Sequence, residues 1–371
     1  MKRLIVVLAL LASIIKVDAK QVMSDPVEPF YIGTYTNGEG KGIYRAGLNT
    51  LTGKLSNPEF VVSSVNPSFI ALTQDKKFLL ATNETDDGSV ESFAVSQNGE
   101  HLKSVCKIPS GGASPCYVSV NAAQFVLAAN YTGGNVALFG MDDEGMLKLN
   151  DVQQHSGSGP VKGRQDKAHV HSALFEPGTD KVFVADLGTD RINIYHLDKK
   201  NKKLDPASVS EIKINPGSGP RHMAFNLAKK VLYIASELSN TVSVVDLKHE
   251  GSYPVVETLS TLPKDFDKVS YAADLHITRD GRFLYVSNRG LNSIAIFSID
   301  QKNGKLKLIA QEPTRGVNPR NFALSPDENY LLVANQSSQN IVAFRRDLKT
   351  GKLTFSDEIK AFTPVCLLFY K

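Results

Sequence analysis

Apolar and polar residues alternate along this chain in short runs that recur as one repeated unit. One copy, from Val170 to Tyr195, has the sequence VHSALFEPGTDKVFVADLGTDRINIY, in which an alternating run, a polar turn, a β-branched run, a second turn and another alternating run follow one another. Alternation with a period of two predicts β-strands, and no helical periodicity of useful length occurs. Similar copies begin at Asn66, Ser114, Gly219, Ala272 and Asn318.

The spacing of the copies indicates the architecture. A polar marker residue ends the second apolar run of each copy, and successive markers stand 47 to 56 residues apart. A fourth strand follows in segments such as GKLKLIAQE, so each unit of about 50 residues supplies four short strands, as in a blade of a β-propeller. The markers are Asn83, Asn130, Asp186, Glu237, Asn288 and Asn335.

The two ends of the repeat complete each other. The segment PFYIGTYTNGEGKGIYRAGLN matches the second and third strands of a unit, with Thr34 as its marker, but no first strand precedes it. The missing strand stands at the other end, where TPVCLLFY (Thr363 to Tyr370) repeats the opening of a unit. We therefore predict that residues 20–371 form a single all-β domain, a seven-bladed β-propeller of four-stranded antiparallel blades. The C-terminal strand pairs into the N-terminal blade and closes the ring.

Residues 1–19 have a different pattern from the repeat. Lys2 and Arg3 precede the apolar run LIVVLALLASII, and Val17 and Ala19 fit the small-residue pattern of a cleavage site. The run of 12 apolar residues is too short to cross a bilayer comfortably, so a cleaved signal peptide is favoured over an uncleaved membrane anchor. We expect a periplasmic or secreted protein, cleaved near Ala19, with no stable membrane anchor afterwards.

Composition and charge narrow the possible partners. The net charge of the chain is +4, and removal of residues 1–19 takes away three basic residues and one acidic residue, which leaves +2. This is not the surplus of a nucleic-acid-binding protein. The 3 cysteines are too few for a disulfide framework. Buried free thiols are expected, with a bridge between Cys106 and Cys116 as the alternative.

Four stretches, in order along the chain, resemble a known family. They are GSGPVKGRQDKAHVHSALFEPG, VADLGTDRINIY, GSGPRHMAF and HITRDGRFLYVSNRGLNSIAIF. With them the chain resembles the lactonase seven-bladed β-propellers, a group that includes bacterial 6-phosphogluconolactonases and a fungal carboxymuconate-lactonizing enzyme. The resemblance covers nearly all of the chain after residue 19.

The resemblance also implies a set of site residues. In the lactonizing relative a His, two Arg and a Glu line the pocket. The matching positions are His171 within HVHSA, Arg221 within GPRH, Glu237 within ASEL and Arg289 within SNRG. We expect these four residues to be catalytic, with Arg221 and Arg289 also binding the substrate.

Two further residues are candidates for substrate binding. Arg320 repeats the position of Arg221 in another copy, and His169 stands two residues before His171. The His-x-His spacing would place both histidines on one face of a strand, where they could suit a metal ion. Because no third ligand is evident, we predict no metal and no cofactor.

The chemistry of lactone opening requires these types of residue. A water must lose a proton, the acyl oxyanion must be stabilised, and the leaving ring oxygen must be protonated. His171 or Glu237 can take the proton, while Arg221 and Arg289 offer forked donors to an oxyanion, a carboxylate or a phosphate. The structural alternative is that Glu237 forms an ion pair with one arginine that only fixes the geometry of neighbouring blades.

Two other histidines are expected to have structural roles. His222 is interpreted as a hydrogen-bonding residue at a strand end. His276 lies in an alternating run and is interpreted as a packed side chain bonded to the backbone. Neither is expected to take part in the reaction.

The predicted function is a 6-phosphogluconolactonase-like lactone hydrolase that opens a sugar lactone by acid–base-assisted attack of water. Whether the lactone is phosphorylated is left open, because phosphorylated sugars belong mainly to the cytosol whereas this chain is expected to be exported. The alternatives are a lactonizing enzyme that acts on a muconate-like dicarboxylate and a secreted propeller that binds a ligand without catalysis. The partner is a small-molecule lactone or carboxylate rather than a nucleic acid, and the oligomeric state is unknown.

Overall fold

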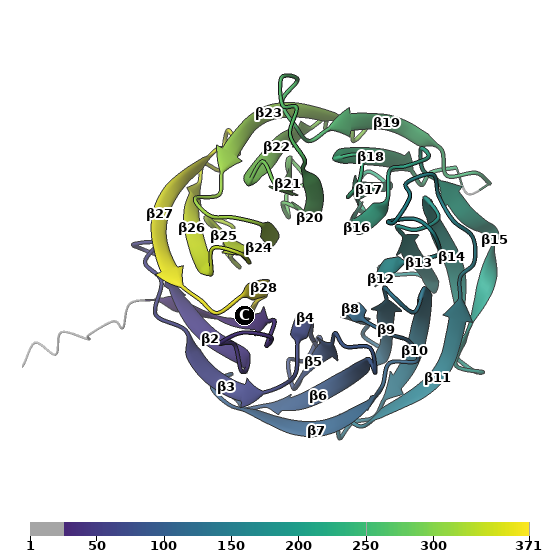
Figure 1. Ribbon diagram of the computed structural model, residues 1–371, viewed down its shortest axis with the longest axis horizontal. Coiled ribbons are helices and arrows are strands. Elements are labelled where there is room, and N and C mark those ends of the chain that lie inside the picture. Colours follow the sequence, from purple (N-terminus) through teal and green to yellow (C-terminus); the bar gives the residue numbers. More distant parts are fainter. Residues whose placement is uncertain (1–25, 250, 371) are drawn as a thin grey trace, which may run out of the picture.

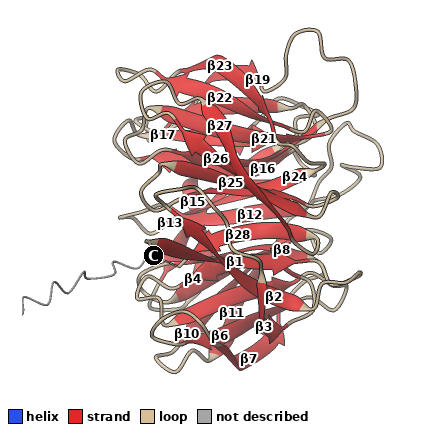
Figure 2. Ribbon diagram, turned by 90° about the vertical axis from the view of Figure 1, so that its left-hand side faces the viewer, coloured by secondary structure: helices blue, strands red, loops and turns tan. Residues whose placement is uncertain are grey.

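The computed structural model describes residues 26–249 and 251–370, which contain strands and loops. The strands form seven antiparallel sheets of four strands, arranged as blades around a common axis (Figure 1); we refer to the region enclosed by the seven inner strands as the channel. Figure 2 shows no helix in this part of the chain. The described residues therefore contain no helix that is long and apolar enough to cross a membrane. The predicted all-β seven-bladed β-propeller is confirmed, while the predicted signal peptide lies outside the described residues.

Each blade is named here with its inner strand first. Blade 1 consists of β28 (Pro364–Phe369), β1 (Val27–Thr34), β2 (Gly42–Asn49) and β3 (Glu59–Ser63). Blade 2 consists of β4 (Pro67–Leu72), β5 (Phe78–Asn83), β6 (Ser89–Val95) and β7 (Leu102–Pro109). Blade 3 consists of β8 (Pro115–Val120), β9 (Phe125–Asn130), β10 (Asn135–Met141) and β11 (Leu147–Gln154).

The other four blades follow the same order. Blade 4 consists of β12 (Val170–Phe175), β13 (Lys181–Asp186), β14 (Arg191–Asp198) and β15 (Lys203–Lys213). Blade 5 consists of β16 (Pro220–Asn226), β17 (Val231–Ser236), β18 (Thr241–Asp246) and β19 (Val255–Ser260). Blade 6 consists of β20 (Tyr271–Ile277), β21 (Phe283–Arg289), β22 (Ser293–Ile299) and β23 (Leu306–Pro313). Blade 7 consists of β24 (Pro319–Leu324), β25 (Tyr330–Asn335), β26 (Asn340–Arg346) and β27 (Leu353–Lys360).

Blade 1 closes the ring as the sequence predicts. The C-terminal strand β28 pairs antiparallel with β1, so that Phe30 lies opposite Phe369 and Ile32 opposite Leu367. Phe30 and Ile32 are fully buried, and the rings of Phe30 and Phe369 are 5.5 Å apart between centroids. Closure leaves blade 1 with the same four strands as every other blade and removes the open edge that would invite aggregation.

Buried tyrosines on the second strands connect successive blades. The hydroxyl of Tyr31 donates to Gly99 O, that of Tyr233 to Gly304 O and that of Tyr285 to Gly351 O, each at 2.7 Å. Each acceptor lies in the outer turn of the next blade. These bonds satisfy phenol groups that would otherwise be buried without a partner, while the rings fill the apolar space between the sheets.

The marker residues have a structural role at the end of the second strand. The side-chain amides of Asn83, Asn130, Asn288 and Asn335 donate to the backbone carbonyls of Val65, Ser110, Thr261 and Thr314 at 2.8–3.1 Å. Each acceptor lies in the segment that enters the blade. One predicted marker is wrong by one residue: Pro220 pairs with Ser236, as Val170 pairs with Asp186, and Glu237 therefore lies just beyond the strand.

All seven inner strands have a register shift near their start, after the first residue in six strands and after the second residue, Ala272, in β20. We call the end of the channel where these strands begin the site end and the opposite end the far end. A bulge bends the strand and redirects the side chain of the extra residue. The positions that directly follow the last residue paired before the shift are occupied by Ser68, Cys116, His171, Arg221, Ala273, Arg320 and Val365.

Contacts between inner strands run around the whole channel. They are Phe69 with Tyr117 (ring centroids 4.1 Å), Ser119 Oγ to Ala173 O (2.8 Å), Ser172 Oγ to Arg221 O (2.6 Å), His222 Nδ1 to Asp274 Oδ1 (2.7 Å), Asn321 Nδ2 to Asp274 Oδ2 (2.6 Å), Leu367 N to Asn321 Oδ1 (2.7 Å) and Cys366 Sγ to Ile70 O (4.0 Å). Every pair of neighbouring blades is thus joined next to the channel, which holds the bulge residues in fixed positions.

Candidate active site

Glu237 is the centre of a cluster of arginines at the site end of the channel. Its Oε2 accepts a hydrogen bond from Arg221 Nε at 3.0 Å and forms an ion pair with Arg289 Nη2 at 2.8 Å. Its Oε1 accepts from Arg164 Nη2 at 2.5 Å. The structure therefore brings together three of the four residues predicted to be catalytic and adds Arg164, which the sequence analysis did not identify.

Equivalent positions of neighbouring blades deliver these side chains. Arg221 occupies the bulge position of β16, and Glu237 is the first residue after β17. A backbone bond from Glu237 N to Gly219 O (2.7 Å) holds the two segments together, and Gly219 has a φ of +64°, which a residue with a side chain rarely adopts. Arg289 is the last residue of β21 in the next blade, one residue beyond the marker Asn288.

Burial and mutual charge determine the protonation of the cluster. Burial raises the pKa of Glu237, but Arg289, Arg221 and Arg164 outweigh it and lower the pKa to about 2. Burial and the charges of Arg289 and Arg320 lower the pKa of Arg221 to about 10. At neutral pH, Glu237 is therefore an anion and the arginines are cations.

The fourth predicted residue, His171, lies beside the cluster. It is buried, and its ring centroid is 5.3 Å from that of His222. Its Nδ1 is 3.7 Å from the thiol of Cys116, which is a free cysteine like Cys106 and Cys366. Burial and the nearby charge of Arg221 lower the pKa of His171 well below its ordinary value, so the imidazole is neutral at pH 7.

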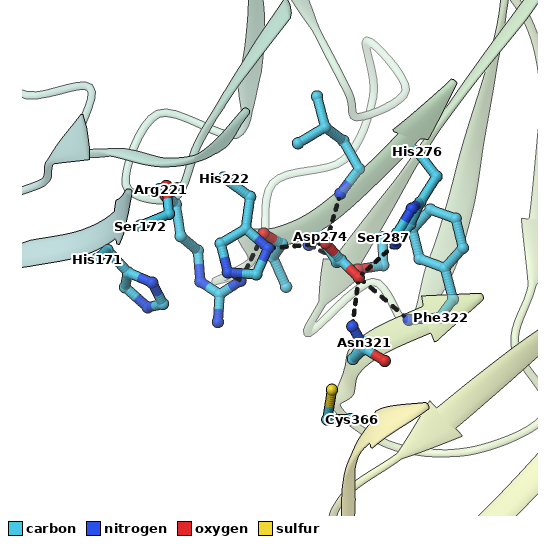
Figure 3. A network of polar contacts seen from close by, with 12 residues as sticks. His171, Ser172, Arg221, His222, Asp274, His276, Ser287, Asn321, Phe322 and Cys366 are labelled. Atoms are coloured by element: carbon cyan, nitrogen blue, oxygen red, sulfur yellow. Dashed lines mark hydrogen bonds and ion pairs between the residues drawn. The ribbon is translucent and has the colours of Figure 1, made fainter. Parts of the chain in front are cut away.

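Asp274 supports the cluster from deeper in the channel (Figure 3). Its carboxylate accepts hydrogen bonds from His222 Nδ1 (2.7 Å), His276 Nε2 (3.0 Å), Asn321 Nδ2 (2.6 Å) and Phe322 N (3.3 Å). His276, which the sequence predicted to be bonded to the backbone, thus has a carboxylate partner as well. Burial raises the pKa of Asp274, but the two histidines lower it far below its usual range.

His222 links Asp274 to Arg221. With Nδ1 bonded to the carboxylate, its Nε2 accepts from Arg221 Nη1 at 3.2 Å, and the same Nη1 donates to Ala273 O at 2.6 Å (Figure 3). Burial and the charge of Arg221 lower the pKa of His222 to about 4, so the ring is neutral and can accept. The predicted hydrogen-bonding role of His222 is confirmed, and its partners fix the orientation of the Arg221 guanidinium.

The two additional binding candidates occupy different places at the site end. Arg320 is half-buried at the bulge position of blade 7, with its Cζ 5.5 Å from the ring centroid of Tyr35. His169 precedes β12, stacks on Tyr131 and has its Nδ1 3.0 Å from Tyr131 O. The predicted placement of His169 and His171 on one face of a strand is wrong, because the strand begins at Val170. No cluster of three metal-ligating side chains exists in the described residues.

Comparison with known proteins identifies the family. A family model described as "Lactonase, 7-bladed beta-propeller" matches residues 29–369. The chain belongs to this family. It is 36% identical over 302 residues to the 6-phosphogluconolactonase of Bacillus subtilis. The aligned region covers 80% of this chain and 85% of that protein. It is 39% identical over 305 residues to the 6-phosphogluconolactonase of Formosa agariphila, with 80% and 86% covered.

A solved structure gives the same result. The lactonase-family propeller superposes on the periplasmic gluconolactonase of Pseudomonas aeruginosa with a TM-score of 0.89, at 29% sequence identity, over 93% of this chain and 99% of that chain. The resemblance inferred from the four sequence stretches is therefore confirmed. The superposition spans all seven blades and so includes the site end of the channel.

Proposed function

We propose that this chain is a lactone hydrolase that opens a sugar lactone at the site end of its channel, with His171, Arg221, Glu237 and Arg289 as the catalytic residues. The observation that supports this proposal is the Glu237 cluster, in which the buried Arg221 and the half-buried Arg289 share one carboxylate oxygen beside a neutral histidine. The names of its relatives, 6-phosphogluconolactonase and gluconolactonase, agree with this chemistry.

The first step is the attack of water on the ring carbonyl. A neutral His171 with its proton on Nδ1 faces the sulfur of Cys116, which leaves Nε2 free to accept the proton of the water. The carbonyl electrons move to oxygen, and Arg221 and Arg289 donate to the resulting oxyanion. Glu237 remains an anion throughout and holds both guanidinium groups in place.

The second step is the opening of the ring. The tetrahedral intermediate collapses, the bond from the carbonyl carbon to the ring oxygen breaks, and the protonated His171 returns its proton to that oxygen. The product is an open-chain hydroxy acid; its carboxyl group releases a proton to solvent, and the resulting carboxylate lies against the arginines. No metal or cofactor takes part in this scheme.

Hydrolysis of glucono-δ-lactone and of 6-phosphoglucono-δ-lactone by the purified protein tests this proposal. We expect turnover of at least one of them above the spontaneous rate, and a loss of about 100-fold or more in kcat for His171→Ala. Arg191→Ala is the control. Arg191 Nη1 forms an ion pair with Glu211 Oε2 at 2.6 Å, and this pair lies on the two outer strands of blade 4, away from the channel. Cyclisation of a muconate without hydrolysis of either lactone would favour the lactonizing alternative, and ligand binding without turnover would favour a non-catalytic propeller.

We also propose that residues 1–19 direct export of the chain and are removed. The charged start, the apolar run and the small residues before Lys20 support this, as does the periplasmic description of the Pseudomonas aeruginosa relative. N-terminal sequencing of the protein from its native source would give a chain that begins at Lys20. A mature chain that retains Met1 would contradict the proposal.

A further inference from the structure

The long connection between β11 and β12, residues 155–169, crosses over the site end of blade 4. Asp186 fixes both ends of this loop. Its Oδ2 is 2.9 Å from Nδ1 of His155, and its Oδ1 accepts from the backbone N of His169 at 2.9 Å. Asp186 replaces the marker asparagine of other blades and is fully buried, so a single carboxylate holds the first and last residues of the loop.

Gln165 fixes the middle of the same loop. Its Nε2 donates to Leu187 O and to Asp190 Oδ1, both at 2.8 Å, and its Oε1 accepts from Val161 N at 3.1 Å. The side chain is fully buried. Since the loop is held at both ends and next to residue 164, Arg164 occupies a defined position at the mouth of the channel.

Arg164 is the most exposed of the three arginines that bind Glu237. Its side chain is 33% exposed, against 14% for Arg289 and 2% for Arg221. Its Cζ lies 5.3 Å from the ring centroid of Tyr271, which is also 5.8 Å from Arg289 Cζ. A ligand that enters from solvent therefore meets Arg164 before it reaches the deeper arginines.

The Glu237 cluster contains more positive than negative charge. Arg164, Arg221 and Arg289 contribute three positive charges against the single carboxylate of Glu237. Within the described residues, Arg320 has no carboxylate within 4.0 Å, and Arg289 Nε is buried without an acceptor. A surplus of this kind in a partly buried site is balanced best by an anionic ligand.

We propose that Arg164 is a specificity-determining residue that changes its partner from Glu237 to a fixed anionic group of the substrate. This group is a phosphate or a carboxylate at the end of the lactone remote from the ring carbonyl. The proposal rests on the proposed function, because it places the carbonyl at Arg221 and Arg289. The exchange leaves the Glu237 carboxylate paired, since Glu237 keeps its ion pairs with both deeper arginines.

The test compares the wild type with Arg164→Ala and Arg164→Lys on three substrates: neutral glucono-δ-lactone, 6-phosphoglucono-δ-lactone and D-glucaro-1,4-lactone, which carries a free carboxylate. For Arg164→Ala, KM for the anionic lactones is expected to rise about 10- to 100-fold more than KM for the neutral lactone. Arg164→Lys keeps the charge and is expected to restore part of the loss. Arg191→Ala, which removes a comparable half-exposed arginine, is expected to behave as the wild type.

The outcomes separate this proposal from the proposed function. A loss confined to the phosphorylated lactone identifies phosphate as the recognised anion, and a loss confined to the glucarolactone identifies a carboxylate. Equal losses on neutral and anionic lactones overturn the proposal while lactonase activity stands. If no lactone is hydrolysed, calorimetry with 6-phosphogluconate and gluconate still decides: tighter binding of 6-phosphogluconate that disappears in Arg164→Ala supports the proposal, and unchanged discrimination overturns it.

Discussion

The two ends of the inner strands satisfy their polar groups in different ways. At the far end, three turns have a hydroxyl–carboxylate bond within the turn itself: Thr73 donates to Asp75 (2.7 Å), Thr278 to Asp280 (2.6 Å) and Ser325 to Asp327 (2.5 Å). At the site end, the partners belong to different blades, as in the pairs of Glu237 with Arg289 and of His222 with Asp274.

Within one repeat unit, the far end of the inner strand has a structural role, whereas the site end carries the residues proposed to act on the substrate. The turns of the far end are local, half-exposed and repeated, which is sufficient to reverse the chain. The site end concentrates buried charges from several blades, at a desolvation cost that stability alone does not require. The comparison teaches that the repeat supplies the scaffold and that departures from it supply the residues to which we assign the proposed chemistry.

The largest effect on stability is expected for Asp274→Ala. This change removes the acceptor of three donors that belong to three blades: the buried His222 and Asn321, and the partly exposed His276. We expect the free energy of unfolding to fall by about 3–5 kcal/mol, because buried donors lose their partner. Chemical denaturation measures it, and a change below about 1 kcal/mol would show that the channel network does not hold the blades together.

Arg221→Lys is expected to separate positioning from charge. A lysine cannot donate at the same time to Glu237, Ala273 O and His222 as the Arg221 guanidinium does. We therefore expect kcat/KM for lactone hydrolysis to fall about 100-fold in a folded protein. The measurement combines kinetics with thermal unfolding, and Arg191→Lys serves as the matched control. Near wild-type activity of Arg221→Lys would mean that only the positive charge matters.

The pH dependence of stability is expected to come from the site end. The folded-state pKa of His222 is about 4, below its ordinary value of 6.5, so the unfolded chain binds protons first and stability falls as the pH drops from about 6.5 to 4. Glu237, with a folded-state pKa of about 2, adds a further loss below about pH 4. His222→Asn removes this titrating group but retains a donor to Asp274. The decrease in Tm between pH 6.5 and pH 4 should therefore be smaller in the variant than in the wild type, by at least about 3 °C. An unchanged slope would contradict this assignment.

The smallest effect is expected for Asp280→Asn at the far end. Its carboxylate is 40% exposed, and its partners lie within the same turn. We expect a change of less than about 1 kcal/mol in the free energy of unfolding and no change in lactone hydrolysis. Chemical denaturation and kinetics check both values. A loss as large as that of Asp274→Ala would remove the distinction between the two ends.

The fold was predictable because it follows from local pattern. Period-two alternation, polar turns and a unit of about 50 residues predicted the blades, and the missing first strand predicted the pairing of β28 with β1. The marker at Glu237 was misplaced because a serine, Ser236, ends β17 where other blades have a more polar residue. A one-residue error of this kind is invisible until the strand pairing is known.

The site was only partly predictable. His171, Arg221, Glu237 and Arg289 were found through the family resemblance and through their departure from the repeat. Arg164 was missed because it lies in a loop, 73 residues from Glu237 along the chain, and no periodicity reports such a contact. A usable signal was the length of the β11–β12 connection, since long loops in compact domains are often functional.

Glu237→Gln is the most direct test of the central claim that the cross-blade cluster at the site end is the catalytic centre. The amide cannot accept at both ends from three guanidinium groups, so Arg221 and Arg289 lose their alignment. Steady-state hydrolysis of the preferred lactone should show kcat reduced by about 100-fold or more in a protein that remains folded, with Asp280→Asn unaffected. Wild-type kcat in folded Glu237→Gln would contradict the account.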